Sequence, residues 1–172
     1  MRGKSYAANQ AKRLLNKCNV KRDGTASHRK YITNVKGIAK QLGIEILPYS
    51  FSEDISGLFF KKGDKLYLGV NSSHSEKRKR FTIAHEIGHF ILHSDEPLHY
   101  DVKELESLHF RSENISDLNE IESNSFAAEL LMPEELVREL IEKGVTSVKK
   151  LSEKFNVSEE AMRYRLINLG YL

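Results

Sequence analysis

The sequence predicts an α+β fold in which a small antiparallel sheet packs on a long helix, with helices before the sheet and a helical subdomain after it. Apolar residues recur at helical spacing toward both ends of the chain. The middle instead holds short runs of β-branched and aromatic residues, at 44–47, 57–60 and 66–70. A Lys-Lys-Gly-Asp segment at 61–64 separates the last two runs and predicts a hairpin turn.

Two helices are expected ahead of the sheet. Residues 6–19 contain neither glycine nor proline and place apolar side chains on one face, and Asp23-Gly24-Thr25 ends this pattern. The second pattern covers 29–42, and Gly43 provides its stop signal. Its apolar face requires a core to pack against.

Helical spacing returns after the sheet, and we expect helices over 75–93, 117–131, 134–142, 147–155 and 158–168. The last two are joined by Asn156-Val157-Ser158 and are typical of a helix-turn-helix. Such a unit would read DNA through Arg163, Arg165 and Asn168, but helical hairpins also close a core without touching DNA. Both interpretations stay open.

Charge is distributed unevenly along the 172 residues, although the net charge is only +3. Residues 1–40 hold eleven lysines and arginines against a single acid, Asp23. A basic surface of this kind binds nucleic acid or an acidic partner, or is simply solvated. We therefore expect a basic helical segment at 1–27, a core domain at 28–133 and the C-terminal subdomain at 134–172.

The composition limits the class of protein. Hydrophobic residues make up 40% and charged residues 30%, which excludes collagen-like and largely disordered chains. The single cysteine, Cys18, cannot form an intramolecular disulfide, and no apolar run approaches the roughly 18 residues of a membrane span. We expect a soluble, cytoplasmic protein without a membrane partner.

One motif carries chemistry: His85-Glu86-Ile87-Gly88-His89 has the pattern H-E-x-x-H within a predicted helix. Residues four apart lie on the same helix face, so both imidazoles can bind a single zinc ion. Glu86 is offset from them and reaches a zinc-bound water instead, as the general base of zinc hydrolases does. The motif therefore predicts a catalytic zinc site.

A catalytic zinc needs a third protein ligand. His93 continues the series, but its backbone lies about 12 Å from that of His85 along a straight helix, too far to share one ion. Glu120 and Asn124 form an i, i+4 pair, in which Glu120 could bind the metal and Asn124 could orient a histidine. Other candidates remain: Glu122 is the rival ligand, and His99 and His109 are weaker rivals, either of which could instead stabilise the oxyanion.

Two longer segments resemble the ImmA/IrrE family of metallopeptidases. They are Arg80-Phe-Thr-Ile-Ala-His-Glu-Ile-Gly-His-Phe-Ile-Leu-His93 and Glu120-Ile-Glu-Ser-Asn-Ser-Phe-Ala-Ala-Glu-Leu-Leu-Met-Pro133. Ser56-Gly57-Leu58 and Gly69-Val70-Asn71 also resemble family segments. The resemblance covers about residues 30–170 and implies a zincin-like metallopeptidase fold, with Glu120 joining the two histidines on Zn²⁺. It also implies cleavage of helix-turn-helix repressors or similar regulators in phage, mobile-element and stress-response circuits.

Two functions are compatible with these residues. The first is a zinc endopeptidase that cleaves a helix-turn-helix-type repressor or an antitoxin, with Glu86 as general base. The alternative is a non-catalytic, zinc-containing regulatory or toxin-like module that binds a repressor, an antitoxin or DNA. The presence of Glu86 favours the enzyme, because a structural zinc site needs no general base.

Overall fold

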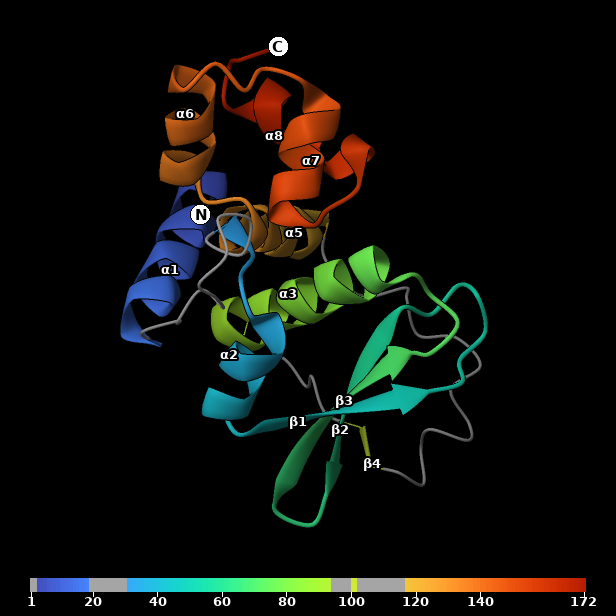
Figure 1. Ribbon diagram of the computed structural model, residues 1–172. Coiled ribbons are helices and arrows are strands. Elements are labelled where there is room, and N and C mark those ends of the chain that lie inside the picture. Colours follow the sequence, from blue (N-terminus) through green and yellow to red (C-terminus); the bar gives the residue numbers. More distant parts are fainter. Residues whose placement is uncertain (1–2, 19–30, 94–99, 102–116) are drawn as a thin grey trace.

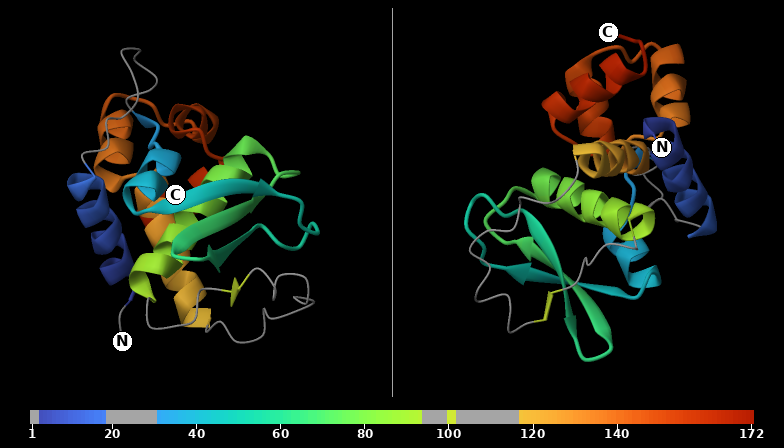
Figure 2. Two further views of the ribbon diagram at one scale, coloured as in Figure 1. Left: turned by 90° about the horizontal axis from the view of Figure 1, so that it is seen from below. Right: turned by 180° about the vertical axis from the view of Figure 1, so that it is seen from behind.

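The computed structural model describes residues 3–18, 31–93, 100–101 and 117–172, and it confirms the α+β class. Its elements are stacked in layers (Figures 1 and 2). The sheet lies on one side of α3 (Glu76–Leu92), and α5 (Asp117–Leu131) lies on the other side. The C-terminal helices pack beyond α5, so that α3 is enclosed between the sheet and a helical layer.

The sheet is mixed rather than antiparallel. Its strands are β1 (Ile44–Tyr49), β2 (Gly57–Lys62), β3 (Lys65–Asn71) and β4 (Tyr100–Asp101), in the order β1-β3-β2-β4. The predicted β2–β3 hairpin is confirmed as antiparallel, but β1 pairs with β3 in parallel and β2 pairs with β4 in parallel. The prediction of an antiparallel sheet is therefore wrong outside the hairpin.

A crossing connection explains the parallel pair. β1 and β3 run in the same direction and end at the same side of the sheet, where β2 begins. The chain therefore crosses the end of β3 on its way from β1 to β2. The fully buried Asn71 fixes this connection, because its side-chain amide donates to the carbonyl oxygens of Ser52 (2.9 Å) and Ile55 (2.8 Å). The side-chain oxygen of Asn71 accepts from the backbone N–H of Ser73 (3.1 Å). With the connection placed in this way, β3 pairs with β1 on one side and with β2 on the other.

Helix α2 (Val35–Gln41) is shorter than the helix predicted over 29–42, of which residues 29–30 lie outside the described part of the chain. It begins after Asn34, whose side chain caps it by accepting a hydrogen bond from the Gly37 backbone N–H (2.8 Å). Before this cap, the Thr33 hydroxyl donates to the carbonyl oxygen of Leu130 (2.8 Å) and attaches the segment to α5.

Helix α1 (Lys4–Lys17) packs along α5 through small and apolar side chains. Ala7 and Ala11 are fully buried, and Leu14 and Cys18 are at most 8% exposed. Lys12, on the same helix, forms an ion pair with Glu134 (3.2 Å). α1 thus shares a core with the central helices, whereas the predicted boundaries after residues 27 and 133 stay predictions.

The C-terminal helices are α6 (Glu134–Glu142), α7 (Val148–Phe155) and α8 (Glu159–Asn168). Asn156 takes the left-handed conformation (φ 54°) that ends α7, and the Ser158 hydroxyl accepts from the Ala161 backbone N–H (3.1 Å) to begin α8. The two helices predicted here and the turn between them are present, whereas their assignment as a helix-turn-helix stays a prediction. Arg165, however, is buried and does not face outward as a DNA-reading residue would.

Candidate metal centre

Helix α3 presents the two histidines of the H-E-x-x-H motif side by side. The Nε2 atoms of His85 and His89 are 2.9 Å apart, and the ring centroids are 4.6 Å apart. His89 is buried at 4% exposure, whereas His85 is half-buried. Both rings therefore direct the same nitrogen to one point, as the four-residue spacing predicts.

Helix α5 completes a group of three. The Glu120 carboxylate places Oε2 3.3 Å from His85 Nε2 and Oε1 3.1 Å from His89 Nε2. Atoms bound to a tetrahedral zinc lie about 3.4 Å from one another, because each is about 2.0–2.2 Å from the metal. The three side chains already stand at nearly this spacing, so the donor set fits a divalent cation that binds nitrogen and oxygen.

Asn124 lies one turn beyond Glu120 on α5 and contacts the far side of His85. Its Oδ1 is 3.0 Å from His85 Nδ1. When Nδ1 carries the proton and donates it to Asn124, Nε2 is left with a free lone pair directed at Glu120 and His89. Asn124 thus favours the tautomer that binds a metal.

The rival ligands do not join this group. Glu122 is buried and turned away, with Oε2 3.9 Å from Nε2 of His93. His93 contacts His89 with ring centroids 5.7 Å apart, and no metal-compatible group of described residues includes it. His99 and His109 lie outside the described residues. Helix geometry accounts for the separation, since Glu120 and Glu122 project about 200° apart around α5.

Glu86 lies beside the group in a desolvated position. Burial raises the pKa of its carboxyl above the ordinary value, and the Glu120 carboxylate adds to this effect, against the lowering influence of His85 and His89. A carboxyl group with a raised pKa is a better proton acceptor and donor near neutral pH than an ordinary glutamate. This environment suits a general base.

The surroundings of His85 and Glu120 shift the pKa values of both side chains. Burial alone lowers the pKa of His85, but contacts with Glu120, Glu86 and Asn124 outweigh it, so the pKa lies above its ordinary value. Hydrogen bonds from His85 and His89 hold the pKa of Glu120 well below its usual range. Negative charge therefore persists at Glu120 under conditions where most glutamates have taken up a proton.

Two glycines bring the elements of the site together, and sequence reasoning missed both roles. A Cβ on Gly88 would lie 3.2 Å from Ser123 Cα, so glycine allows α5 to approach α3. A Cβ on Gly57 would lie 2.6 Å from Thr82 Cγ2 and 3.5 Å from Glu86 Cγ, so β2 begins directly against α3. An isolated glycine in a strand is the available signal for such a close approach.

A helix with two histidines one turn apart, completed by a carboxylate from a second helix and covered by a small sheet, defines the metallopeptidase class. The comparison with known families agrees with this assignment. Residues 39–167 match the IrrE N-terminal-like domain, peptidase family M78. The chain therefore belongs to the ImmA/IrrE family of metallopeptidases, whose members use a metal cofactor.

Three relatives show how far the similarity extends. The chain is 35% identical over 100 residues to the radiation response metalloprotease IrrE of Deinococcus radiodurans. The aligned residues cover 56% of this chain and 29% of that protein. It is 33% identical over 100 residues to IrrE of Deinococcus deserti, covering 56% and 34%. It is 30% identical over 110 residues to an uncharacterized immunity region protein 2 of Bacillus phage phi105, covering 63% and 65%. The matches thus span 29% to 65% of the relatives' lengths.

None of the helices that the structure describes is long and apolar enough to cross a bilayer.

Proposed function

We propose that this protein is a zinc-dependent endopeptidase that cleaves a helix-turn-helix-type repressor, or a similar regulator such as an antitoxin, in the cytoplasm. The observation that carries the proposal is the convergence of His85, His89 and Glu120, whose ligand atoms all lie within 4.8 Å of one another. Asn124 supports it by orienting His85. Two histidines and one carboxylate leave a fourth position free, which a catalytic zinc requires and a structural zinc does not.

Each residue has a defined part in peptide hydrolysis. Zinc, when bound, supplies Lewis acidity that polarises a peptide carbonyl and lowers the pKa of a water molecule. Glu86 accepts the proton of the attacking water and transfers it to the leaving amide nitrogen, for which its raised pKa is suitable. His85, His89 and Glu120 hold the ion, and Asn124 keeps the His85 proton on Nδ1.

The names of the relatives support a regulatory substrate. Two are called radiation response metalloproteases, and a third comes from the immunity region of a phage. These contexts agree with a peptidase that inactivates a repressor when the cell or the phage changes state. We therefore expect the substrate to be a protein with a helix-turn-helix rather than an unfolded polypeptide of arbitrary sequence.

The proposal is tested first at the general base. Glu86→Gln removes the proton acceptor but leaves the ligands, so it should retain zinc and lose cleavage of a candidate repressor. Cleavage at the wild-type rate by this variant would exclude the proposed role of Glu86. A chelator should stop cleavage by the wild-type protein, and added zinc should restore it.

The ligand assignment requires a separate pair of variants. Glu120→Ala should lower the zinc content, whereas Glu122→Ala should retain it because Glu122 contacts His93 instead. The opposite result would transfer the ligand role to Glu122. Metal analysis of both purified proteins decides between them without requiring a substrate.

The same assay addresses the alternative of a non-catalytic module. A stable complex with the repressor and no chelator-sensitive fragments would support a binding role. Direct contact with DNA would show itself as an affinity that falls steeply with salt. Of the three residues predicted to read DNA, only Arg163 and Asn168 are exposed.

A further inference from the structure

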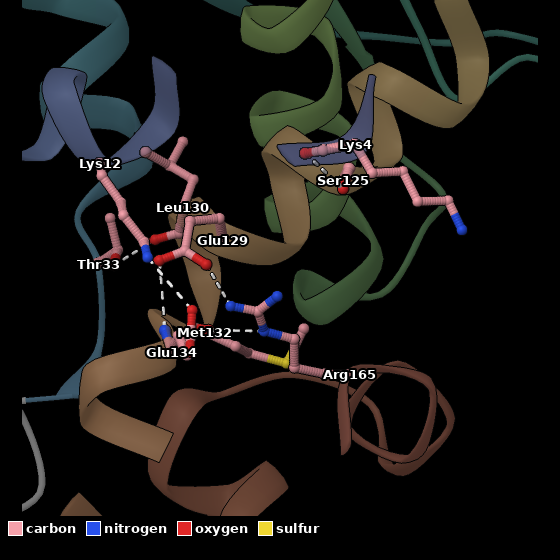
Figure 3. Close-up of polar contacts among 9 residues, drawn as sticks. All are labelled: Lys4, Lys12, Thr33, Ser125, Glu129, Leu130, Met132, Glu134 and Arg165. Carbon is pink, nitrogen blue, oxygen red and sulfur yellow. Dashed lines mark hydrogen bonds and ion pairs between the residues drawn. The ribbon is translucent and has the colours of Figure 1, made fainter. Parts of the chain in front are cut away.

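A buried ion pair connects the metal-bearing helix α5 to the C-terminal subdomain. Glu129 of α5 is 1% exposed, and its Oε2 pairs with Nη2 of Arg165 on α8, which is 7% exposed (Figure 3). The Arg165 Nε also donates to the carbonyl oxygen of Met132 (3.0 Å). On the other side of the carboxylate, Oε1 accepts from the Glu134 backbone N–H (3.3 Å). One carboxylate thus joins three helices: α5, α6 and α8.

Stability alone is a weak explanation for this pair. Removing two charges from water is costly, and apolar residues of similar size often replace a buried ion pair without loss of stability. An arginine–carboxylate contact instead restricts the relative orientation of its two partners, because the planar guanidinium donates hydrogen bonds only within a narrow range of angles. The pair therefore specifies how α5 is oriented more effectively than it strengthens the core.

The position of Glu129 on α5 connects this orientation to the metal centre. Glu120 and Glu129 are nine residues apart, which corresponds to about 13.5 Å along the axis and half a turn around it. Glu120 consequently faces α3, whereas Glu129 faces α8 on the opposite side of the same helix. Polar contacts thus hold α5 on two opposite faces: His85 and His89 contact Glu120 on one face, and Arg165 contacts Glu129 on the other.

The remaining contacts of α5 set its distance from its neighbours better than its rotation. Against α3 it packs at Gly88, where Ser123 and Phe126 make the closest approach, and against α1 it meets the small residues Ala7 and Ala11. Small apolar surfaces of this kind have no directional bond. Three other polar side-chain contacts of α5 are longer or uncharged: the Thr33 hydroxyl donates to the Leu130 carbonyl (2.8 Å), the Ser125 hydroxyl donates to the Lys4 carbonyl (3.4 Å), and the buried Glu122 carboxylate lies 3.9 Å from His93 Nε2 (Figure 3 shows the first two).

We propose that Arg165 is a positioning residue for the metal centre: through Glu129 it fixes the rotation of α5 at which Glu120 and Asn124 meet the α3 histidines. This inference rests on the proposed function of the His85, His89 and Glu120 group. It assigns the C-terminal subdomain a direct role in assembling that group. Arg165, which the sequence suggested as a DNA contact, serves the metal instead.

The test compares two variants of α8 in the full chain at a temperature where both are folded. Arg165→Met removes the directional bond and keeps an apolar stem of similar length. Met162→Ala removes packing from the same helix at a fully buried position and leaves the ion pair intact. Zinc affinity is measured by competition with a chromogenic chelator, and the ligand geometry by the visible spectrum of the Co²⁺-substituted protein.

We expect Arg165→Met to bind zinc roughly tenfold more weakly and to alter the cobalt spectrum, as supporting residues around metal ligands do. Met162→Ala should melt at a lower temperature while its zinc affinity and spectrum stay those of the wild type. Arg165→Lys, which keeps the charge but loses the planar fork, should fall between wild type and Arg165→Met. It also replaces Arg165→Met in the comparison if that variant does not fold.

The inference is overturned if a folded Arg165 variant has the zinc affinity and cobalt spectrum of the wild type. It is also overturned if Met162→Ala loses as much zinc affinity, because the effect would then be general destabilisation. Either outcome leaves the proposed function intact, since the wild-type protein still binds zinc. A wild-type protein that binds no zinc would instead refute the proposed function, and this inference with it.

Discussion

The close crossing of α3 and α5 at Gly88 leads to a prediction in which stability and metal binding separate. Alanine in a helix interior is normally favoured over glycine by about 1 kcal/mol. At Gly88, however, the new methyl group would lie 3.2 Å from Ser123 Cα and 3.2 Å from Phe126 Cδ1. Ordinary contacts between carbon atoms are about 3.5–4.0 Å, so α5 must retreat by a few tenths of an ångström.

The two effects partly offset each other in stability, but nothing offsets the displacement of the metal ligand. Overpacking of a core costs about 1–3 kcal/mol, so the free energy of unfolding of metal-free Gly88→Ala should fall by only about 0–2 kcal/mol. Glu120 lies on α5 one turn before Ser123 and moves with it. Metal–ligand distances tolerate about 0.2 Å, so zinc affinity should fall by about tenfold or more.

Chelator competition gives the zinc affinity, and denaturant unfolding in a chelator gives the stability. Ile83→Val is a suitable control, because Ile83 is a buried residue of α3 whose truncation typically costs about 0.5–1.5 kcal/mol without pushing α5 away. This control should keep the wild-type affinity. If Gly88→Ala also keeps it, the close approach of the helices does not set the ligand geometry, and the reasoning fails.

Three further predictions concern the same site. Asn124→Ala should weaken zinc binding by about tenfold, as measured by chelator competition, because the His85 tautomer is no longer fixed; an unchanged affinity would exclude this role. Acidification should weaken zinc binding from a pH above that expected of an ordinary histidine, because the His85 pKa is raised and the proton competes for Nε2. In the metal-free protein, the same raised pKa makes low pH favourable for folding: protonated His85 adds stability at low pH, and this stability is lost as the pH rises through the pKa. Glu120 acts in the other direction, because its pKa is lowered and the stability that it adds is lost as the pH falls. Melting curves with and without zinc across pH would show both trends, and parallel curves would contradict them. Gly57→Val should lower the melting temperature more than the same change at the exposed Gly3, because its Cβ would meet Thr82 Cγ2 at 2.6 Å; equal losses at the two positions would contradict this packing.

Local signals in the sequence predicted most of the helices. Ser75, Ser147 and Ser158 each cap the helix that follows, and the observed boundaries lie within two residues of those predicted from 117 onward. The helix predicted over 29–42 begins late because Asn34 supplies a cap inside an otherwise continuous apolar pattern. Apolar spacing alone does not register such a cap.

Strand pairing was harder to predict, because it depends on residues distant in sequence. The β-branched and aromatic residues of each run indicate a strand but not its neighbour in the sheet, and turn signals identify a pairing only between consecutive strands. The parallel pairing of β1 with β3 depends on the segment between β1 and β2, which is held by hydrogen bonds from Asn71, the last residue of β3. No turn signal in the sequence marks that contact.

The candidate site divides in the same way. Helix periodicity alone places His85 and His89 on one face, and the structure brings their rings together. The choice between Glu120 and Glu122 depends on the rotation of α5 against α3, which spacing within α5 leaves open. The prediction for Arg165 differs most from the structure, which buries a residue that the sequence suggested as a DNA contact. Its partner Glu129 lies 36 residues away, and nothing in the neighbouring sequence indicates that the charge is buried.

The three grouped ligands come from two helices that are distant in sequence, since Glu120 follows His89 by 31 positions. An ion bound by both helices acts as a crosslink that closes this long segment. Under the proposed function, a bound ion would contribute to folding as well as to catalysis, by about 2.7 kcal/mol when the free metal exceeds its dissociation constant a hundredfold. Metal-free copies of the protein would therefore unfold more readily than metal-bound copies, whether or not a substrate is present.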